Sequence, residues 1–128
     1  MSITHLAIVS VPVSDQDRAR DFYVDTLGFE LIADSPMGPD QRWVQVGPKG
    51  SQTSLTLVTW FESMPAGSVK GLVLECDDVR ATHDELSSRG VTFTGPIEEQ
   101  FWGTFSTFDD PDGNGWVLQQ APSERSNR

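Results

Sequence analysis

The sequence contains a single cysteine, Cys76, and only two lysines, Lys49 and Lys70, among its 128 residues. One cysteine cannot form a disulfide within the chain, and it fits a reducing compartment. The longest uncharged apolar stretch, Leu6–Val13, is far shorter than the roughly 20 residues that a membrane-spanning helix needs. The first residues also lack the basic and apolar regions of a signal peptide. We therefore expect a cytoplasmic protein that makes no contact with a membrane.

Positive charge is scarce, because 9 Lys and Arg residues stand against 19 Asp and Glu residues, for a net charge of −10. A protein that binds DNA or RNA neutralises phosphates with a basic patch, so this composition argues against a nucleic-acid partner. An acidic surface also repels anionic lipid and favours a cationic ligand. The same surplus of acid serves solubility by itself, and both interpretations stay open.

Several catalytic patterns are missing as well. The chain has no Gly-x-Gly-x-x-Gly motif, no phosphate-binding loop and no Ser–His–Asp arrangement. Cys76 stands beside Asp77 and Asp78, whose charges are expected to raise the pKa of the thiol and so disfavour nucleophilic chemistry. What is present is a hydrophobic share of 37%, which is enough for one compact domain with a core of its own.

The strongest positive signal is an internal repeat. Ala19 and Gly28 correspond to Ala81 and Gly90 at one constant offset, and the residues around them match in type. A repeat of this size indicates two copies of one supersecondary unit. In each copy a polar cap follows an apolar strand, and a helix then ends at a glycine.

Three more strand-like segments follow the helix in each copy. We predict helices over Gln16–Leu27 and Val79–Arg89. We predict strands over Leu6–Val13, Phe29–Ser35, Arg42–Val46, Ser54–Phe61, Gly71–Cys76, Val91–Thr94, Gly103–Phe108 and Gly115–Gln120. Pro96–Gln100 is expected to be a polar loop.

This pattern predicts an α+β fold made of two βαβββ modules, each with a sheet that carries its helix on one face. Module one covers about residues 3–62 and module two about residues 69–120, within a single domain over residues 1–120. The linker between the modules, Glu62–Lys70, contains Pro65 and Gly67. Residues 121–128 are polar and are expected to form a mobile tail.

Three segments with the right order and spacing, Val11–Phe29, Leu74–Val91 and Trp102–Asn114, resemble the vicinal oxygen chelate superfamily. That superfamily includes glyoxalase I, bleomycin-resistance proteins, fosfomycin-resistance thiol transferases and extradiol dioxygenases. The resemblance covers about residues 3–120. It implies paired βαβββ modules with curved sheets, a small ligand on the concave side, and a homodimer.

Enzymes of this superfamily hold a divalent metal on His, Glu or Gln side chains from the first and last strand of each module. The resemblance places Ile8, Thr56, Gly71 and Val117 at these positions, and none of them is a good metal ligand. His5 lies three residues before Ile8, so strand alternation points it to the opposite face. We therefore expect no bound metal and no other cofactor.

Strand alternation, combined with the geometry that the resemblance implies, divides the side chains between a core face and a concave face. The concave face should be mostly apolar with few polar groups, as small-molecule sites usually are. The ligand-binding candidates on it are Ile8, Trp43, Thr56, Gly71, Glu75, Trp102, Val117 and Gln119.

Glu75 and Trp102 are the most informative of these candidates. Glu75 could serve as the counter-ion of a cationic ligand or as a general base, whereas a salt bridge to Arg42 or Arg80, or exposure at the strand end, would explain it without any ligand. Trp102, followed by Trp43, could stack on a planar ligand at the edge of the pocket. A place in the core is the alternative for each aromatic residue.

Two classes of function agree with these features. The first is a metal-free binding protein, similar in kind to the bleomycin-resistance branch, that sequesters a small aromatic or cationic molecule. The alternative is an enzyme of the lyase, isomerase or dioxygenase-like type with Glu75 as its base. A sensor or assembly module with a vestigial cavity is a third interpretation. The residues leave the identity of the ligand open.

Overall fold

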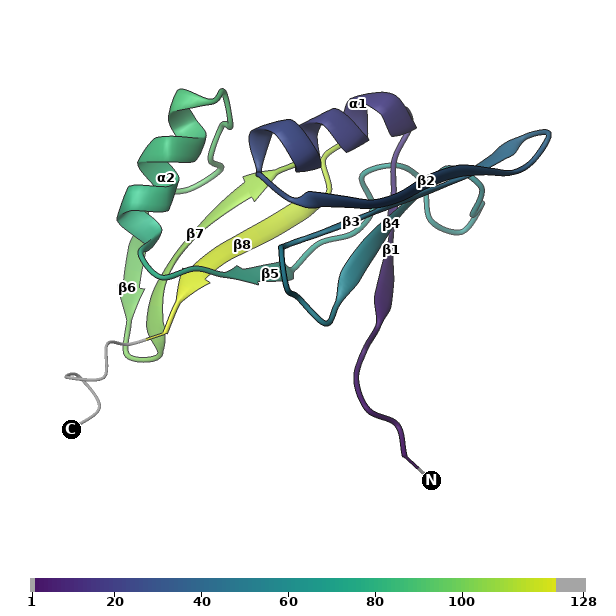
Figure 1. The fold of residues 1–128 in the computed structure, drawn as a ribbon. Coiled ribbons are helices and arrows are strands. Elements are labelled where there is room, and N and C mark those ends of the chain that lie inside the picture. The colour runs from purple at the N-terminus through teal and green to yellow at the C-terminus, as the bar shows by residue number, and fades with distance from the viewer. Residues whose placement is uncertain (1, 122–128) are drawn as a thin grey trace.

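The computed structural model describes residues 2–121 and contains two four-stranded sheets, each with its own helix (Figure 1). The expected tail lies almost entirely outside the described residues. Sheet A has the strand order β1-β4-β3-β2, and sheet B has the order β5-β8-β7-β6. The strands are β1 (Ile8–Pro12), β2 (Glu30–Gly38), β3 (Gln41–Gly47), β4 (Ser54–Val58), β5 (Leu72–Glu75), β6 (Glu98–Gln100), β7 (Gly103–Asp109) and β8 (Gly115–Gln120).

The two sheets repeat one topology, which confirms the predicted α+β fold. In each module the first strand pairs in parallel with the last strand, and the remaining neighbours pair antiparallel. A parallel pair needs a long crossover connection, and here the helix and two further strands provide it. No helix among the described residues is long and apolar enough to cross a membrane.

The first helix, α1 (Gln16–Asp21), begins after Asp15, whose carboxylate accepts hydrogen bonds from the Asp17 and Arg18 amides. This cap satisfies amides that have no partner within the helix. The prediction of one regular helix up to Leu27 was only partly right. The chain continues as a wider π-helical segment, η1 (Phe22–Thr26), in which the Leu27 amide donates to the Phe22 carbonyl at 3.0 Å.

The second helix, α2 (Val79–Ser88), begins in the same way after Asp78, whose carboxylate accepts from the Ala81 amide. Glycine follows the helical segment in both modules. Gly28 and Gly90 have φ angles of 82° and 97°, a conformation that residues with a Cβ atom rarely adopt. The predicted helix ends are therefore confirmed.

The predicted strand Val91–Thr94 was wrong, and so was the predicted loop Pro96–Gln100. Phe93 forms only an isolated bridge to Phe108, and the ladder resumes as β6. Pro96 stands between the two stretches and lacks an N–H group, which explains why the ladder along β7 is interrupted there.

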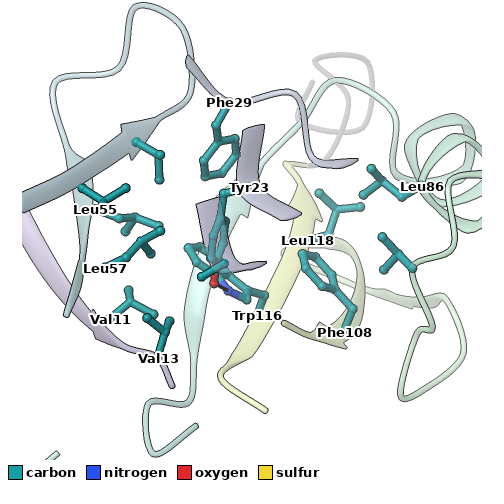
Figure 2. Packing of buried hydrophobic residues seen from close by; sticks show 14 residues of the cluster. Val11, Val13, Tyr23, Phe29, Leu55, Leu57, Leu86, Phe108, Trp116 and Leu118 are labelled. Carbon is teal, nitrogen blue, oxygen red and sulfur yellow. Dashed lines mark hydrogen bonds between the residues drawn. The ribbon is translucent and has the colours of Figure 1, made fainter. Parts of the chain in front are cut away.

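One hydrophobic core joins the two modules. Both helices lie on the same side of the sheets (Figure 1), and the buried side chains of both sheets meet beneath them. In Figure 2, Tyr23 lies between aliphatic side chains of sheet A and the Trp116 and Leu118 side chains of sheet B. Val11 and Trp116 are buried as strand alternation predicted.

A buried polar network reinforces this junction. The Tyr23 hydroxyl donates to Asp110 Oδ2 at 2.6 Å and accepts from Trp116 Nε1 at 2.9 Å. Asn114 Nδ2 donates to the same Asp110 oxygen and to the Pro12 carbonyl, both at 2.8 Å. Asp110 is only 5% exposed, so its charge depends on these donors for stabilisation.

Candidate functional site

Each sheet has one face without a helix, which we call its open face. On sheet A this face carries Ile8, whereas Val11 points into the core. On sheet B it carries Val73 and Glu75, whereas Leu74 packs against the core. The alternation inferred from the sequence is therefore confirmed for both sheets.

The open face of sheet B carries a carboxylate beside an aromatic stack. Glu75 Oε1 accepts a hydrogen bond from Gln119 Nε2 at 3.0 Å, and these two residues are direct partners in the ladder. Phe105 is the antiparallel partner of Gln119 and therefore shares its face. The Trp102 ring stacks on Phe105, with a centroid distance of 5.2 Å and an angle of 22°. Trp102 remains 42% exposed, so part of its surface is free to meet a ligand.

On the open face of sheet A, uncharged polar side chains are joined by hydrogen bonds. Trp43 Nε1 donates to Gln45 Oε1 at 3.0 Å, and Gln45 Nε2 donates to Ser54 Oγ at 2.8 Å. Thr56 is only 3% exposed, and its hydroxyl has no hydrogen-bond partner among the described residues. These side chains can offer hydrogen bonds to a ligand but cannot neutralise a cation.

Glu75 does not form either of the salt bridges considered for it. Arg42 pairs instead with Asp34 at 2.7 Å, and Arg80 pairs with Glu99 at 2.8 Å. Among residues 2–121, the side chain that hydrogen-bonds to Glu75 is the uncharged Gln119. The exposed carboxylate therefore keeps its charge available to a ligand.

The aromatic residues divide between the core and the surface. Phe108 and Trp116 are buried, and Trp102 and Trp43 lie on the open faces. Phe61 and Phe101 are exposed in the segments after β4 and before β7. Trp102 and Trp43 are the two stacking candidates, and stacking on a ligand remains a prediction for both.

The predicted site residues form two groups within the chain. Ile8, Trp43 and Thr56 lie on sheet A. The second group belongs to sheet B: Glu75, Val117 and Gln119 on its strands, Gly71 directly before β5, and Trp102 directly before β7. No hydrogen bond joins the two groups among the described residues. The apolar hollow described next includes none of the eight candidates in its lining.

An apolar hollow that the sequence did not suggest lies between the two sheets. It encloses about 240 Å³, and its lining includes Leu6 and Val9 from the β1 side and Leu72, Val73 and Leu74 from β5. Both strands are at the outer edge of their sheets, so the hollow opens where two unpaired edges approach each other. The sequence alone does not show that β1 and β5 are edge strands, because the order in which strands pair depends on the whole fold.

The four positions that the resemblance assigns to metal ligands do not fit a metal ion here. Ile8, Gly71 and Val117 offer no donor atom, and the Thr56 hydroxyl is buried. In the described part of the chain, no three His, Cys, Asp or Glu side chains gather in a way that could hold a metal ion. The side chains at these positions therefore do not fit the metal that the resemblance implies.

Cys76 does not provide a reactive centre either. Burial is the main cause that raises the pKa of its thiol, and the charges of Glu75 and Asp77 add to the effect. The direction agrees with the prediction from the sequence, although burial rather than neighbouring charge dominates. A thiol with a raised pKa is a weak nucleophile at neutral pH.

Two paired βαβββ modules, each with a four-stranded sheet of the same strand order, define the class of protein. The chain belongs to the Glyoxalase/Bleomycin resistance protein/Dioxygenase superfamily, whose model matches residues 2–118. This agrees with the resemblance found in the sequence. The superfamily contains several chemistries, so membership alone does not specify a reaction.

Three proteins illustrate what the whole chain is similar to. The chain is 52% identical to TnmS3, an antibiotic-binding protein from Streptomyces sp. CB03234, with a TM-score of 0.89 and coverage of 95% of this chain and 99% of that one. It is 39% identical to a superfamily member from Sphaerobacter thermophilus, with a TM-score of 0.85 and coverage of 92% and 98%. It is also 38% identical to YetH of Bacillus subtilis, over 92% of this chain and 99% of the relative.

Proposed function

We propose that the protein binds a small planar aromatic molecule on its open faces and sequesters it without a metal ion. The observation that carries this proposal is the Trp102–Phe105 stack, which is exposed on the same face as the Glu75 carboxylate, with Gln119 between them. An exposed aromatic surface beside an acid is suited to stack on a flat ring and to attract a cation. The likeness to TnmS3, which is described as an antibiotic-binding protein, supports the same proposal.

The test is calorimetry with two probes of one shape: acridine, which is neutral at neutral pH, and 9-aminoacridine, which is a cation. Replacing Trp102 with Ala should weaken both probes about three- to tenfold, because the ring supplies a stacking surface. Trp102→Phe keeps a ring and should lose less. Affinities should not change when EDTA is added, since the proposed binding does not use a metal.

The matched control is Phe61→Ala, because Phe61 is 45% exposed, close to the 42% of Trp102, but follows β4 of sheet A, whereas the stack belongs to sheet B. Its removal should leave both affinities unchanged. If Phe61→Ala weakens the probes as much as Trp102→Ala, or if Trp102→Ala binds acridine like the wild type, the proposed site is wrong.

A catalytic role is the second candidate, and Glu75 is the observation in its favour. Its carboxylate is exposed and is held in place by a single hydrogen bond from Gln119, so it could reach a proton on a bound substrate. Mass spectrometry of each bound compound after incubation separates the two functions. Recovery of unchanged compound supports sequestration, and conversion that Glu75→Gln abolishes supports an enzyme.

We also propose that the working form is a homodimer. Leu6 is 65% exposed and Val73 is 53% exposed at the edges that flank the apolar hollow. A symmetric contact between two copies would cover these side chains and the unpaired strand edges.

A further inference from the structure

One residue from each strand of sheet B stands in a single row across the sheet. The ladder pairs Glu75 with Gln119, Gln119 with Phe105, and Phe105 with Glu98. Directly opposite residues share a face, and the Glu75–Gln119 hydrogen bond confirms this for the first pair. The row therefore lies on the open face and has a carboxylate at each end.

Neither end of the row is neutralised by a basic side chain within residues 2–121. Glu75 is bonded to Gln119, and Glu98 is exposed on the short edge strand β6. The next residue, Glu99, pairs with Arg80, and strand alternation places it on the other face. Two negative charges thus flank an aromatic surface on one side of the sheet.

The length of the row indicates what kind of ligand could pair with the carboxylates of both Glu75 and Glu98. Neighbouring strands are about 4.8 Å apart, so the backbones of Glu75 and Glu98 are separated by roughly 14 Å. Gln119 holds the Glu75 carboxylate at its own end, and the Phe105 ring with Trp102 stacked on it lies nearer to Glu98. A single ammonium group placed at one end leaves the carboxylate at the other end without a partner.

We infer that the preferred ligands are aromatic dications, with a flat ring on the Trp102–Phe105 stack and one cationic nitrogen toward each of Glu75 and Glu98. This inference rests on the proposed function and adds the charge of the ligand and the role of Glu98. An ordered set of two charges and a ring selects a ligand by the spacing of its groups as well as by its total charge.

The experiment adds quinacrine, an acridine dication at neutral pH, to acridine and 9-aminoacridine. Binding of all three is measured by calorimetry with the wild type, Glu75→Gln, Glu98→Gln and the double variant. Quinacrine should bind the wild type about tenfold more tightly than acridine, and each single substitution should weaken quinacrine about three- to fivefold. The double variant should combine both losses, and acridine should bind all four proteins equally.

Glu99→Gln is the matched control, since it removes the same charge from the neighbouring position on the other face. It should leave quinacrine affinity within about twofold of the wild type. If Glu98→Gln behaves like Glu99→Gln, or if quinacrine binds no better than acridine, the inference is overturned. The proposed function then still stands as long as acridine binding depends on Trp102. If none of the three compounds binds, both are wrong.

Discussion

Tyr23 shows how much of this fold depends on one hydroxyl group. The hydroxyl connects the buried Asp110 carboxylate to the indole of Trp116, so it joins the first module to two residues of the second. A buried carboxylate is stable only while donors surround it. Asp110 therefore has a structural role at the junction of the two modules.

Removing that hydroxyl should destabilise the protein. Tyr23→Phe leaves Trp116 Nε1 without its acceptor and removes one donor from Asp110. We expect the free energy of unfolding in urea to fall by about 1–3 kcal/mol. Ser63→Ala, which removes a hydroxyl from an exposed residue, should change it by less than about 0.5 kcal/mol. Equal stability of Tyr23→Phe and the wild type would contradict the network.

The same residue should govern stability at alkaline pH. Burial, assisted by the Asp110 charge, raises the pKa of the Tyr23 hydroxyl above its ordinary value. Its contribution is complete below the pKa of an unfolded tyrosine, about 10, and is lost as the pH rises beyond that value. Denaturation series at increasing pH should therefore show a steeper loss of stability in the wild type than in Tyr23→Phe.

At the level of residues, strand alternation predicted which side chains face the core, because one face of each sheet is buried. It could not decide whether Phe105 belongs to the core or the open face until the register with Gln119 was known. Glu98 was missed because three residues are too few to show alternation, and Pro96 nearby indicated a loop. The register between two strands depends on residues far apart in the sequence, so alternation within one strand does not predict it.

Among the elements, the hairpin of β2 and β3 is tied to α1 by charge. Asp34 on β2 accepts two hydrogen bonds from Arg42 on β3, at 2.7 and 2.8 Å, and one from Arg20 on α1 at 3.0 Å. A two-pronged contact between a guanidinium and a carboxylate is stronger than a single surface ion pair. The cluster fixes the long hairpin (Figure 1) against the helix.

This cluster should weaken in acid. The hydrogen bonds from Arg42, and then those from Arg20, hold the pKa of Asp34 at about 2. Its contribution to stability is present above the pKa of an unfolded aspartate, about 3.9, and is lost as the pH falls from there toward 2. When thermal unfolding is followed at decreasing pH, the unfolding temperature of Asp34→Asn should fall less than that of the wild type over this range. Asp40→Asn, in the exposed turn of the same hairpin, should behave like the wild type.

The elements themselves were mostly predictable, since both modules carry capping aspartates, amphipathic helices and terminal glycines. The misplaced sixth strand has a specific cause. Thr94 still donates its amide to the Thr107 carbonyl at 2.7 Å, so the expected pairing begins. Pro96 then interrupts it, and the longer ladder forms at Glu98–Gln100 instead. The apolar residues of Val91–Thr94 led to a strand prediction there. The ladder forms at Glu98–Gln100 instead, because those residues have backbone N–H groups and Pro96 does not.

For the whole molecule, the main prediction concerns assembly. Light scattering at micromolar concentration should give the mass of two chains. Val73→Asp, which places a charge at the edge of β5, should shift the mass toward one chain, because burial of an unpaired charge is costly. Phe61→Asp, at an exposed position outside the hollow, is the control and should remain a dimer. A wild type with the mass of one chain would contradict the proposed assembly.

The hydrogen bonds around Asp110 also have a consequence for the order of protein synthesis. The ribosome makes Asp110 87 residues after its partner Tyr23, and Asn114 102 residues after its partner Pro12. Contacts so distant in sequence form late and slow down folding. During synthesis, the first module therefore cannot complete this junction until Asp110 and Asn114 have left the ribosome.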